Sequence, residues 1–456
     1  MRLLAHGIGG VRDLPVPDVY FYVGGFIVLV VTFVALGALW HRPLLERHEP
    51  GRTLPGPLQT VLLSRALRVL VGALSVFLLV LVLTTALFGT SLELLNFAPT
   101  FVYVIFWIGL PLLSVVLGDV WRVLSPWRAL ADATVWVIER TGRVAKPLLE
   151  PADRFGRYPA ALGLFAFVTL ELAHPRPGYP RTVGVAVALY SYWALAGMAV
   201  FGRESWTRNG EGFAVAFGLL ARIAPFAARD GAIVIRWPFT GLAGAERMRG
   251  TLVFIGVMLG STTFDGFSRS SVWQNVLSDI RAELADRPLW LIDLATTLAN
   301  IGGLALFVVA VVVTYSGAVE AARRLVRAPR SLVPDFVLPL VPIAFAYAVA
   351  HYFSLFVIQG QFIFPLASDP FGKGWDLFGT VDFAPNLAIV SPNLVWWVQS
   401  VALVVGHMAG LAIAHDRAVS LFERRGDALR SQYPVLGLMV LYTLGGMWLL
   451  SRLFQS

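Results

Sequence analysis

Apolar residues along the chain gather into ten long runs separated by polar segments. A helix needs about 20 apolar residues to cross a ~30 Å hydrocarbon core. The runs are continuous rather than alternating, so they predict helices rather than the strands of a barrel. We therefore expect one all-α integral membrane domain, residues 1–456. The predicted spans lie near residues 20–40, 67–89, 95–117, 158–174, 181–201, 250–268, 289–316, 336–359, 394–415 and 433–451.

Basic residues are distributed unevenly over the two sides of this predicted bundle. Of the 36 Lys and Arg residues, 27 fall on one side and nine on the other. An excess of Lys and Arg marks the cytoplasmic side of a membrane. This explains the net charge of +8 without nucleic acid, and it places both termini on the exterior side. The basic segments are 41–68, 118–157, 202–249, 317–335 and 416–432.

Three connecting segments have patterns of their own. Residues 118–157 mix Trp with Arg, which is typical of helices at the headgroup level, and Pro126 predicts a break there. Residues 202–249 contain EGFAVAFGLLARIAPF, which is too short to span and predicts a re-entrant or interfacial segment, and then AIVIRWPF, which predicts a short strand. Residues 360–393 form the longest predicted exterior loop.

The amino-acid composition excludes several kinds of protein and of site chemistry. Hydrophobic residues make up 57% of the chain and charged residues 14%, against roughly 25% charged in soluble domains. There is no cysteine, which excludes disulfides and thiolate chemistry. Motifs for nucleotide binding, zinc proteases and serine hydrolases are missing, so we expect neither a nucleotide nor a flavin. The expected partners are the lipid bilayer and a small molecule or ion; protein partners stay open.

Five ionisable side chains lie inside the predicted spans. Such groups are costly in lipid, and each is a functional hypothesis. No Lys or Arg lies deep in a span to neutralise the acids. We expect the first four in the outer half of the membrane and the last near its middle. They are Glu171, Asp265, Asp293, His351 and His407.

Polar neighbours at helical spacing suggest that these groups face into the bundle. Asp293 is followed by Thr296 and Asn300 on one face, and His351 shares a face with Tyr347. If these faces converge, they form a polar cavity that opens outward under the exterior loop. The further cavity candidates are Glu171, Asn300, Tyr347, Gln359, Gln361 and Asp369.

Two imidazoles with carboxylates suit a divalent transition metal such as Zn, Cu or Fe. A metal would supply the missing positive charge and generate a hydroxide nucleophile from water. In this hypothesis His351, His407 and Asp265 are ligands, and Asp265 or Asp293 acts as the catalytic base. His6, in the N-terminal arm, is a further candidate ligand.

Structural alternatives exist for the same residues. His407 can serve as a hydrogen bond between helices, and Asp265 can pair with Arg269 one turn later. Asp293 can be solvated among the headgroups, and Glu171 can lie at the interface. The sequence alone does not decide between these structural roles and the metal site.

Five strings carry a resemblance to a known family: HGIGGVRDLPVP at 6–17, GDVWRVLSPWRAL at 118–130, TTFDGFSRSSVW at 262–273, AHYFSLFVIQGQFIFPLASDPFGKGWDLFGT at 350–380, and GHMAGLAIAHDRA at 406–418. Together they resemble bacterial polytopic membrane proteins that carry the name fenitrothion hydrolase, over nearly the whole chain. The resemblance implies hydrolysis of an organophosphorus ester in a bacterial cytoplasmic membrane. It assigns no catalytic residues.

Three functions follow as hypotheses. The first is a metal-dependent hydrolase of organophosphorus-type esters with an outward-facing site. The second is a transporter for a metal ion or small polar solute, in which Pro111 and Pro342 would allow broken helices. The absence of ionisable residues from the inner halves of the spans weighs against transport. The third is a non-catalytic accessory subunit of a membrane complex.

Overall fold

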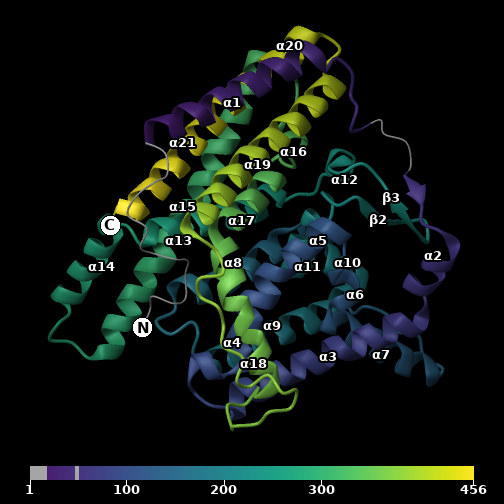
Figure 1. Cartoon of the computed structure of the whole chain (residues 1–456). Coiled ribbons are helices and arrows are strands. Elements are labelled where there is room, and N and C mark those ends of the chain that lie inside the picture. The colour runs from purple at the N-terminus through teal and green to yellow at the C-terminus, as the bar shows by residue number, and fades with distance from the viewer. Residues whose placement is uncertain (1–17, 47–50, 456) are drawn as a thin grey trace.

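Long helices dominate the computed structural model, which describes residues 18–46 and 51–455 (Figure 1). His6 lies outside the described residues. All ten predicted spans fall on helices, and the predicted all-α bundle is confirmed. The long helices are α1 Asp18–Leu39, α3 Arg65–Phe88, α4 Phe97–Thr100 with η3 Phe101–Gly109 and α5 Leu110–Leu117, α8 Tyr158–Ala173, α9 Pro180–Phe201, α13 Thr251–Ser268, α15 Leu289–Leu325, α17 Leu340–Gln359, α19 Pro392–Leu421 and α21 Tyr433–Gln455.

Seven of the described helices are long and apolar enough to cross a membrane, judged by length and composition. Two further apolar helices, Val23–Leu39 and Tyr158–Ala173, are shorter. The protein is therefore a multi-pass helical membrane protein. Shorter elements connect the long helices: α2 Gly56–Leu62, η2 Glu93–Leu95, α6 Trp121–Leu124, α7 Pro126–Arg140, η4 Ala152–Phe155, α10 Arg203–Asn209, α11 Gly212–Leu220, α12 Thr240–Ala243, α14 Ser271–Glu283, α16 Val333–Phe336, η5 Gly360–Phe362, α18 Ile363–Ser368 and α20 Arg425–Arg430.

The predicted break and the predicted strand are both present. Helices α6 and α7 meet at Ser125, whose hydroxyl caps α7 by accepting a hydrogen bond from the N–H of Arg128. Strand β3 (Ala232–Ile235) pairs antiparallel with β2 (Phe226–Arg229) and β1 (Arg52–Thr53), in the order β1-β3-β2. Asp230 and Gly231 both have positive φ, as a two-residue hairpin turn requires.

The segment η3 is a nine-residue π-helix between α4 and α5. Pro99 and Pro111 lie on either side of it, and proline has no N–H for the regular helical hydrogen bond. Wide helical turns of this kind are frequent at functional sites. This one carries Phe106 and Trp107, whose rings both pack against Phe213.

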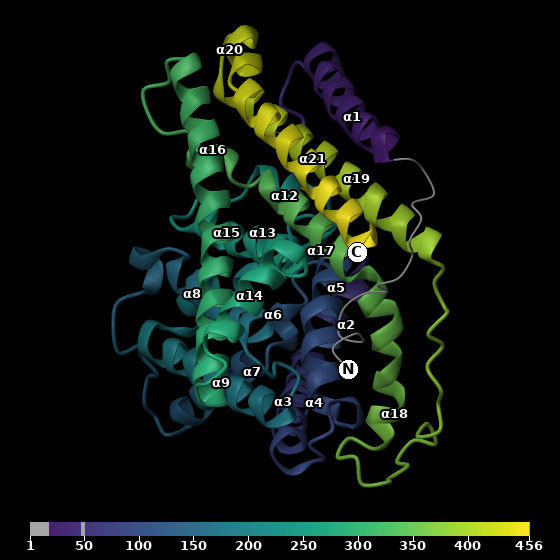
Figure 2. The ribbon, with the colours of Figure 1, turned by 90° about the vertical axis from the view of Figure 1, so that its left-hand side faces the viewer.

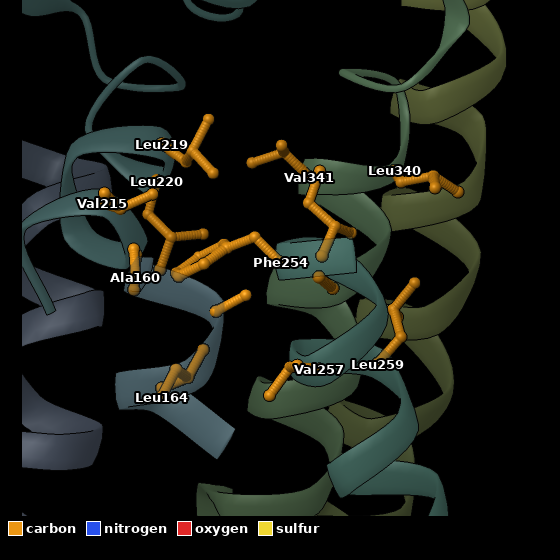
Figure 3. Packing of buried hydrophobic residues seen from close by; sticks show 14 of the residues in the cluster. Ala160, Leu164, Val215, Leu219, Leu220, Phe254, Val257, Leu259, Leu340 and Val341 are labelled. Carbon is orange, nitrogen blue, oxygen red and sulfur yellow. The ribbon is translucent and has the colours of Figure 1, made fainter. Parts of the chain in front are cut away.

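Small residues bring the central helices close together. A Cβ on Gly260 of α13 would lie 2.7 Å from the Cα of Val308 in α15, and one on Gly406 of α19 would lie 2.2 Å from the Cβ of Ala346 in α17. Close backbone approach at small residues is the usual way in which helices pack in membranes. Figure 3 shows the buried apolar side chains that join α8, α11, α13 and α17: Ala160, Leu164, Val215, Leu219, Leu220, Phe254, Val257, Leu259, Leu340 and Val341.

Candidate functional site

Two of the predicted ionisable residues are in direct contact. His351 Nε2 of α17 lies 2.5 Å from Asp265 Oδ2 of α13. Asp265 is buried, and the His351 side chain is 19% exposed. Arg269, at the C-terminal end of α13, donates to the other oxygen of Asp265 at 3.1 Å. The positive charge that seemed missing from the spans therefore comes from a residue one turn beyond the acid.

Glu171 of α8 lies beside this pair. The hydroxyl of Tyr352 donates to Glu171 Oε1 at 3.4 Å, and the Tyr352 and His351 rings lie perpendicular with centroids 4.6 Å apart. The second oxygen of Glu171, Oε2, is buried and accepts no hydrogen bond within the described part of the chain. Helix α13 packs against both α8 and α17 (Figure 1), which is why the three helices can share these groups.

We call this group the ionisable cluster: Glu171, Asp265, Arg269, His351 and Tyr352. With both carboxylates ionised and the imidazole neutral, these described residues carry a net charge of −1, from two acids and one guanidinium. Ionisable groups that meet at a buried site titrate together rather than independently. The cluster is therefore suited to taking up and releasing a proton.

Asp293 does not join the cluster. Its side chain is exposed on α15. On the same helix the Asn300 side-chain oxygen accepts a 2.9 Å hydrogen bond from Trp273 Nε1, and Thr296 bonds to the backbone of its own helix. The polar face of α15 is thus used for packing against α14 and for local hydrogen bonds.

His407 is fully buried in α19, but it lies apart from the Asp265 pair. Its Nδ1 is 2.8 Å from the carbonyl oxygen of Leu403 in the same helix, and its ring packs against Tyr347 with centroids 6.1 Å apart. Tyr347 donates in turn to the carbonyl oxygen of Tyr442. The hydrogen bond of His407 therefore lies within α19 and is not the hydrogen bond between helices of the structural alternative.

The remaining cavity candidates lie in or near the loop of residues 360–393. Gln361 exchanges two hydrogen bonds with the backbone of Asn386, and Asp369 accepts from the N–H groups of Lys373 and Gly374. Gln359 is half-buried at the end of α17. The loop after α18 runs along the outside of the bundle to the start of α19 (Figure 2).

The predicted metal site is not assembled from the described residues. Within residues 18–46 and 51–455, no group of three or more His, Asp and Glu side chains is placed to hold a metal ion. Asp265 and His351 provide two adjacent candidate donors, and His407 does not complete the set. The metal hypothesis therefore stays a prediction, and we derive no chemical step through a metal.

The sequence analysis missed a buried glutamate. Glu211 is fully buried before α11 and accepts four hydrogen bonds: from Trp121 Nε1 at 3.0 Å, Tyr190 OH at 2.5 Å, and the N–H groups of Phe213 at 2.9 Å and Ala214 at 2.8 Å. An acidic residue directly before an apolar helical run is an N-cap signal that could have identified it.

Glu211 and Glu171 lie toward opposite ends of α8. Gly212 packs against α8 between Ala160 and Leu164, about nine residues before Glu171, which corresponds to roughly 14 Å along the helix. Glu211 therefore lies in the half of the bundle away from Glu171, where the predicted spans themselves contain no acidic residue.

Aromatic rings separate the two carboxylates. The Trp107 centroid lies 4.9 Å from that of Phe167 and 6.0 Å from that of Phe213. Trp107 also packs on the apolar cluster that contains Tyr352. We call Trp107, Phe167 and Phe213 the aromatic partition. It lies between the ionisable cluster on one side and Glu211 on the other.

Further buried charges hold the predicted cytoplasmic end together. Asp335 is buried with three guanidinium groups around it, at 2.8 Å from Arg247, 2.6 Å from Arg330 and 2.7 Å from Arg417. Asp416 accepts hydrogen bonds from Trp40 and from the backbone after α1. These acids are satisfied by fixed partners, which is the pattern of a structural junction.

Glu204 of α10 lies outside the spans and is part of an exposed ion-pair network. It contacts Arg128, Arg122 and Arg203. Partial burial acts to raise the pKa of Glu204, but the hydrogen bond and charge of Arg128, with the other two arginines, outweigh it and lower the pKa from 4.5. The network joins α7 to α10.

Comparison of the chain with protein-family models, with curated proteins and with solved structures found no match. The resemblance to fenitrothion hydrolases therefore stays a prediction, and function has to be argued from the geometry.

Proposed function

We propose that the protein is a secondary transporter for a small polar solute, and that the ionisable cluster binds one proton in each cycle. The observation that carries this is the meeting of Asp265, His351, Arg269 and Glu171 from three apolar helices. The group contains two acids, one imidazole and one guanidinium, so binding or release of one proton changes its charge by one unit. Such a change in a low-dielectric site is what couples proton binding to a conformational change.

The geometry suggests where the proton is held. Asp265 Oδ2 and His351 Nε2 are 2.5 Å apart, so a proton bound by either residue lies between the two atoms. Tyr352 links the neighbouring Glu171 to the same region through its hydroxyl. The two acids thus act as a coupled pair around one imidazole, so the proton belongs to the cluster rather than to one residue.

A route to the other side of the membrane would pass the aromatic partition. Trp107 of this partition sits in the π-helix η3, where the backbone departs from regular helical hydrogen bonding. Broken helices at mid-membrane depth are common at transport sites. Movement of Trp107 away from Phe213 would join the ionisable cluster to the side on which Glu211 lies.

Hydrolysis is a second candidate, because a carboxylate that orients an imidazole is also the arrangement of a general base. In that case His351 would take a proton from water, with Asp265 holding the ring. The resemblance to fenitrothion hydrolases favours an organophosphorus ester as the substrate.

For the orientation, we propose that the basic segments face the cytoplasm of a bacterial cell. The support is the bias of Lys and Arg to one side of the bundle.

Proteoliposomes with a trapped pH-sensitive dye test the proposal. Amino acids, sugars, carboxylic acids and divalent cations are added outside, and inward proton movement is recorded. We expect at least one solute to drive proton influx in the wild type, and Asp265→Asn to abolish it. Asp293→Asn is the matched control, because Asp293 is an exposed aspartate outside the cluster.

The same preparations separate the two candidate functions. They are assayed for release of nitrophenol from a nitrophenyl phosphotriester. Hydrolysis that is lost in His351→Ala, with no solute-driven proton movement, would replace transport by the second candidate.

A further inference from the structure

The bundle contains an apolar cavity of about 650 Å³ between α3, η3, α8 and α9. This volume lies within the range of about 300–1,000 Å³ that is typical of small-molecule sites. Glu171, Asp265 and His351 do not line it. The cavity is therefore separate from the ionisable cluster, and a ligand could bind in it whether or not the protein is a transporter.

The lining of the cavity provides no free hydrogen-bonding group. Each polar side chain in it already donates a hydrogen bond to another part of the protein: Ser75 to the Val71 carbonyl, Trp121 and Tyr190 to Glu211, Trp127 to Ser191, and Trp193 to the Gly210 carbonyl. The other lining residues are aliphatic or aromatic, apart from one glycine. Water needs two to four polar partners, so the chemistry of this lining selects hydrocarbon.

The cavity reaches the surface between α8 and α9. Leu162 and Leu189 line it and are 60% and 66% exposed. The neighbouring Val185 and Tyr192 on α9 are exposed as well, so this side of the helix is an outward-facing apolar surface. In a multi-pass membrane protein such a surface meets lipid chains, and the cavity opens into the hydrocarbon of the bilayer.

The length of the cavity matches one lipid chain. Its lining on α9 runs from Val183 to Trp193, which is ten residues or about 15 Å along the helix. Half of a ~30 Å hydrocarbon core is the depth that a chain of one leaflet fills. The long direction of the lining follows α9, a candidate span, and so runs parallel to the lipid chains.

We propose that this cavity is a binding site for one acyl chain of a bilayer phospholipid, which enters sideways between α8 and α9. The rings of Phe106 and Phe167 contact the bound chain from the inner wall, and the leucines at the opening flank it. The headgroup stays outside the cavity, at the membrane surface.

Photolabelling tests the site. The protein is reconstituted with a phosphatidylcholine that carries a diazirine in one acyl chain, irradiated, digested and mapped by mass spectrometry. We expect labels on the half-buried lining residues Leu170 and Ala186 in higher yield than on Val185 and Ala188, which are exposed and do not line the cavity. Ala186→Trp, which fills the cavity, should lower this labelling by about tenfold.

Ala188→Trp is the matched control, since Ala188 lies two residues further on α9, is exposed and does not line the cavity. Equal labelling of lining and outward-facing residues in the wild type would overturn the proposal, and so would equal labelling of the two variants. If Ala186→Trp does not fold, Ala166→Trp fills the cavity from α8, and the wild-type pattern is decisive alone. Proton influx in the same vesicles is a separate readout, so failure of one proposal leaves the other intact.

Discussion

Replacing Glu211 by alanine should destabilise the protein strongly. The carboxylate accepts four hydrogen bonds and is fully buried, so alanine leaves the indole of Trp121 and the hydroxyl of Tyr190 without their acceptor. An unsatisfied buried donor costs about 1–3 kcal/mol. Loss of the cap at α11 adds about 0.5–2 kcal/mol. Removal of a buried carboxylate offsets part of this, and we expect a net loss of about 3 kcal/mol.

The assay is denaturant unfolding in mixed micelles, followed by tryptophan fluorescence. Glu211→Gln keeps one acceptor oxygen and should lose about half as much stability. Glu139→Ala, at an exposed glutamate of α7, is the control and should change stability by less than about 0.5 kcal/mol. A double-mutant cycle with Trp121→Phe should give a coupling energy of about 1–2 kcal/mol. An Ala variant as stable as the Glu139 control would refute the reasoning.

Three further predictions concern other parts of the fold. The pKa of Glu204 is lowered in the folded protein, so the stability that its carboxylate contributes is present above about pH 4.5 and is lost as the pH falls through the folded-state pKa. Thermal unfolding measured against pH should show this loss in the wild type and not in Glu204→Gln. Gly197→Ala should destabilise the protein by about 1–3 kcal/mol, because a Cβ there would lie 1.9 Å from the ring of Trp206. Gly218→Ala, where no atom lies within 4 Å of the added Cβ, should be neutral or stabilising. Denaturant unfolding compares the two variants, and equal stability would contradict the close packing at Gly197. Asp335→Asn should cost at least about 2 kcal/mol in the same assay, because it leaves three guanidinium groups without their shared carboxylate; wild-type stability would show that the junction contributes nothing.

The helices could be predicted from the sequence because a membrane span is a local property. A run such as residues 394–415 specifies its own helix through length and apolar character, whatever its neighbours are. The broken helix at Pro126 and the strand at 232–235 also follow from local chemistry. The π-helix η3 was not predicted, because no residue pattern distinguishes it from a regular apolar helix.

The candidate site could be predicted only in part, because convergence depends on how the helices rotate against each other. Spacing along one helix identified Asp265 and His351 as inward-facing but also suggested the same for Asp293, which is exposed. His407 is buried as expected, yet it hydrogen-bonds to its own helix. Glu211 was missed because it lies in the connecting segment 202–249, and the search was limited to the predicted spans.

The central claim is that the ionisable cluster binds the coupled proton rather than the solute. The most direct measurement compares two activities of Asp265→Asn in proteoliposomes, with a solute identified by the proton-influx screen. One is accumulation driven by a proton gradient, and the other is exchange of labelled for unlabelled solute without a gradient. The account predicts that accumulation is lost and exchange is kept, with both intact in Asp293→Asn. Retained accumulation would contradict the account, and so would loss of exchange, which would place Asp265 at the solute itself.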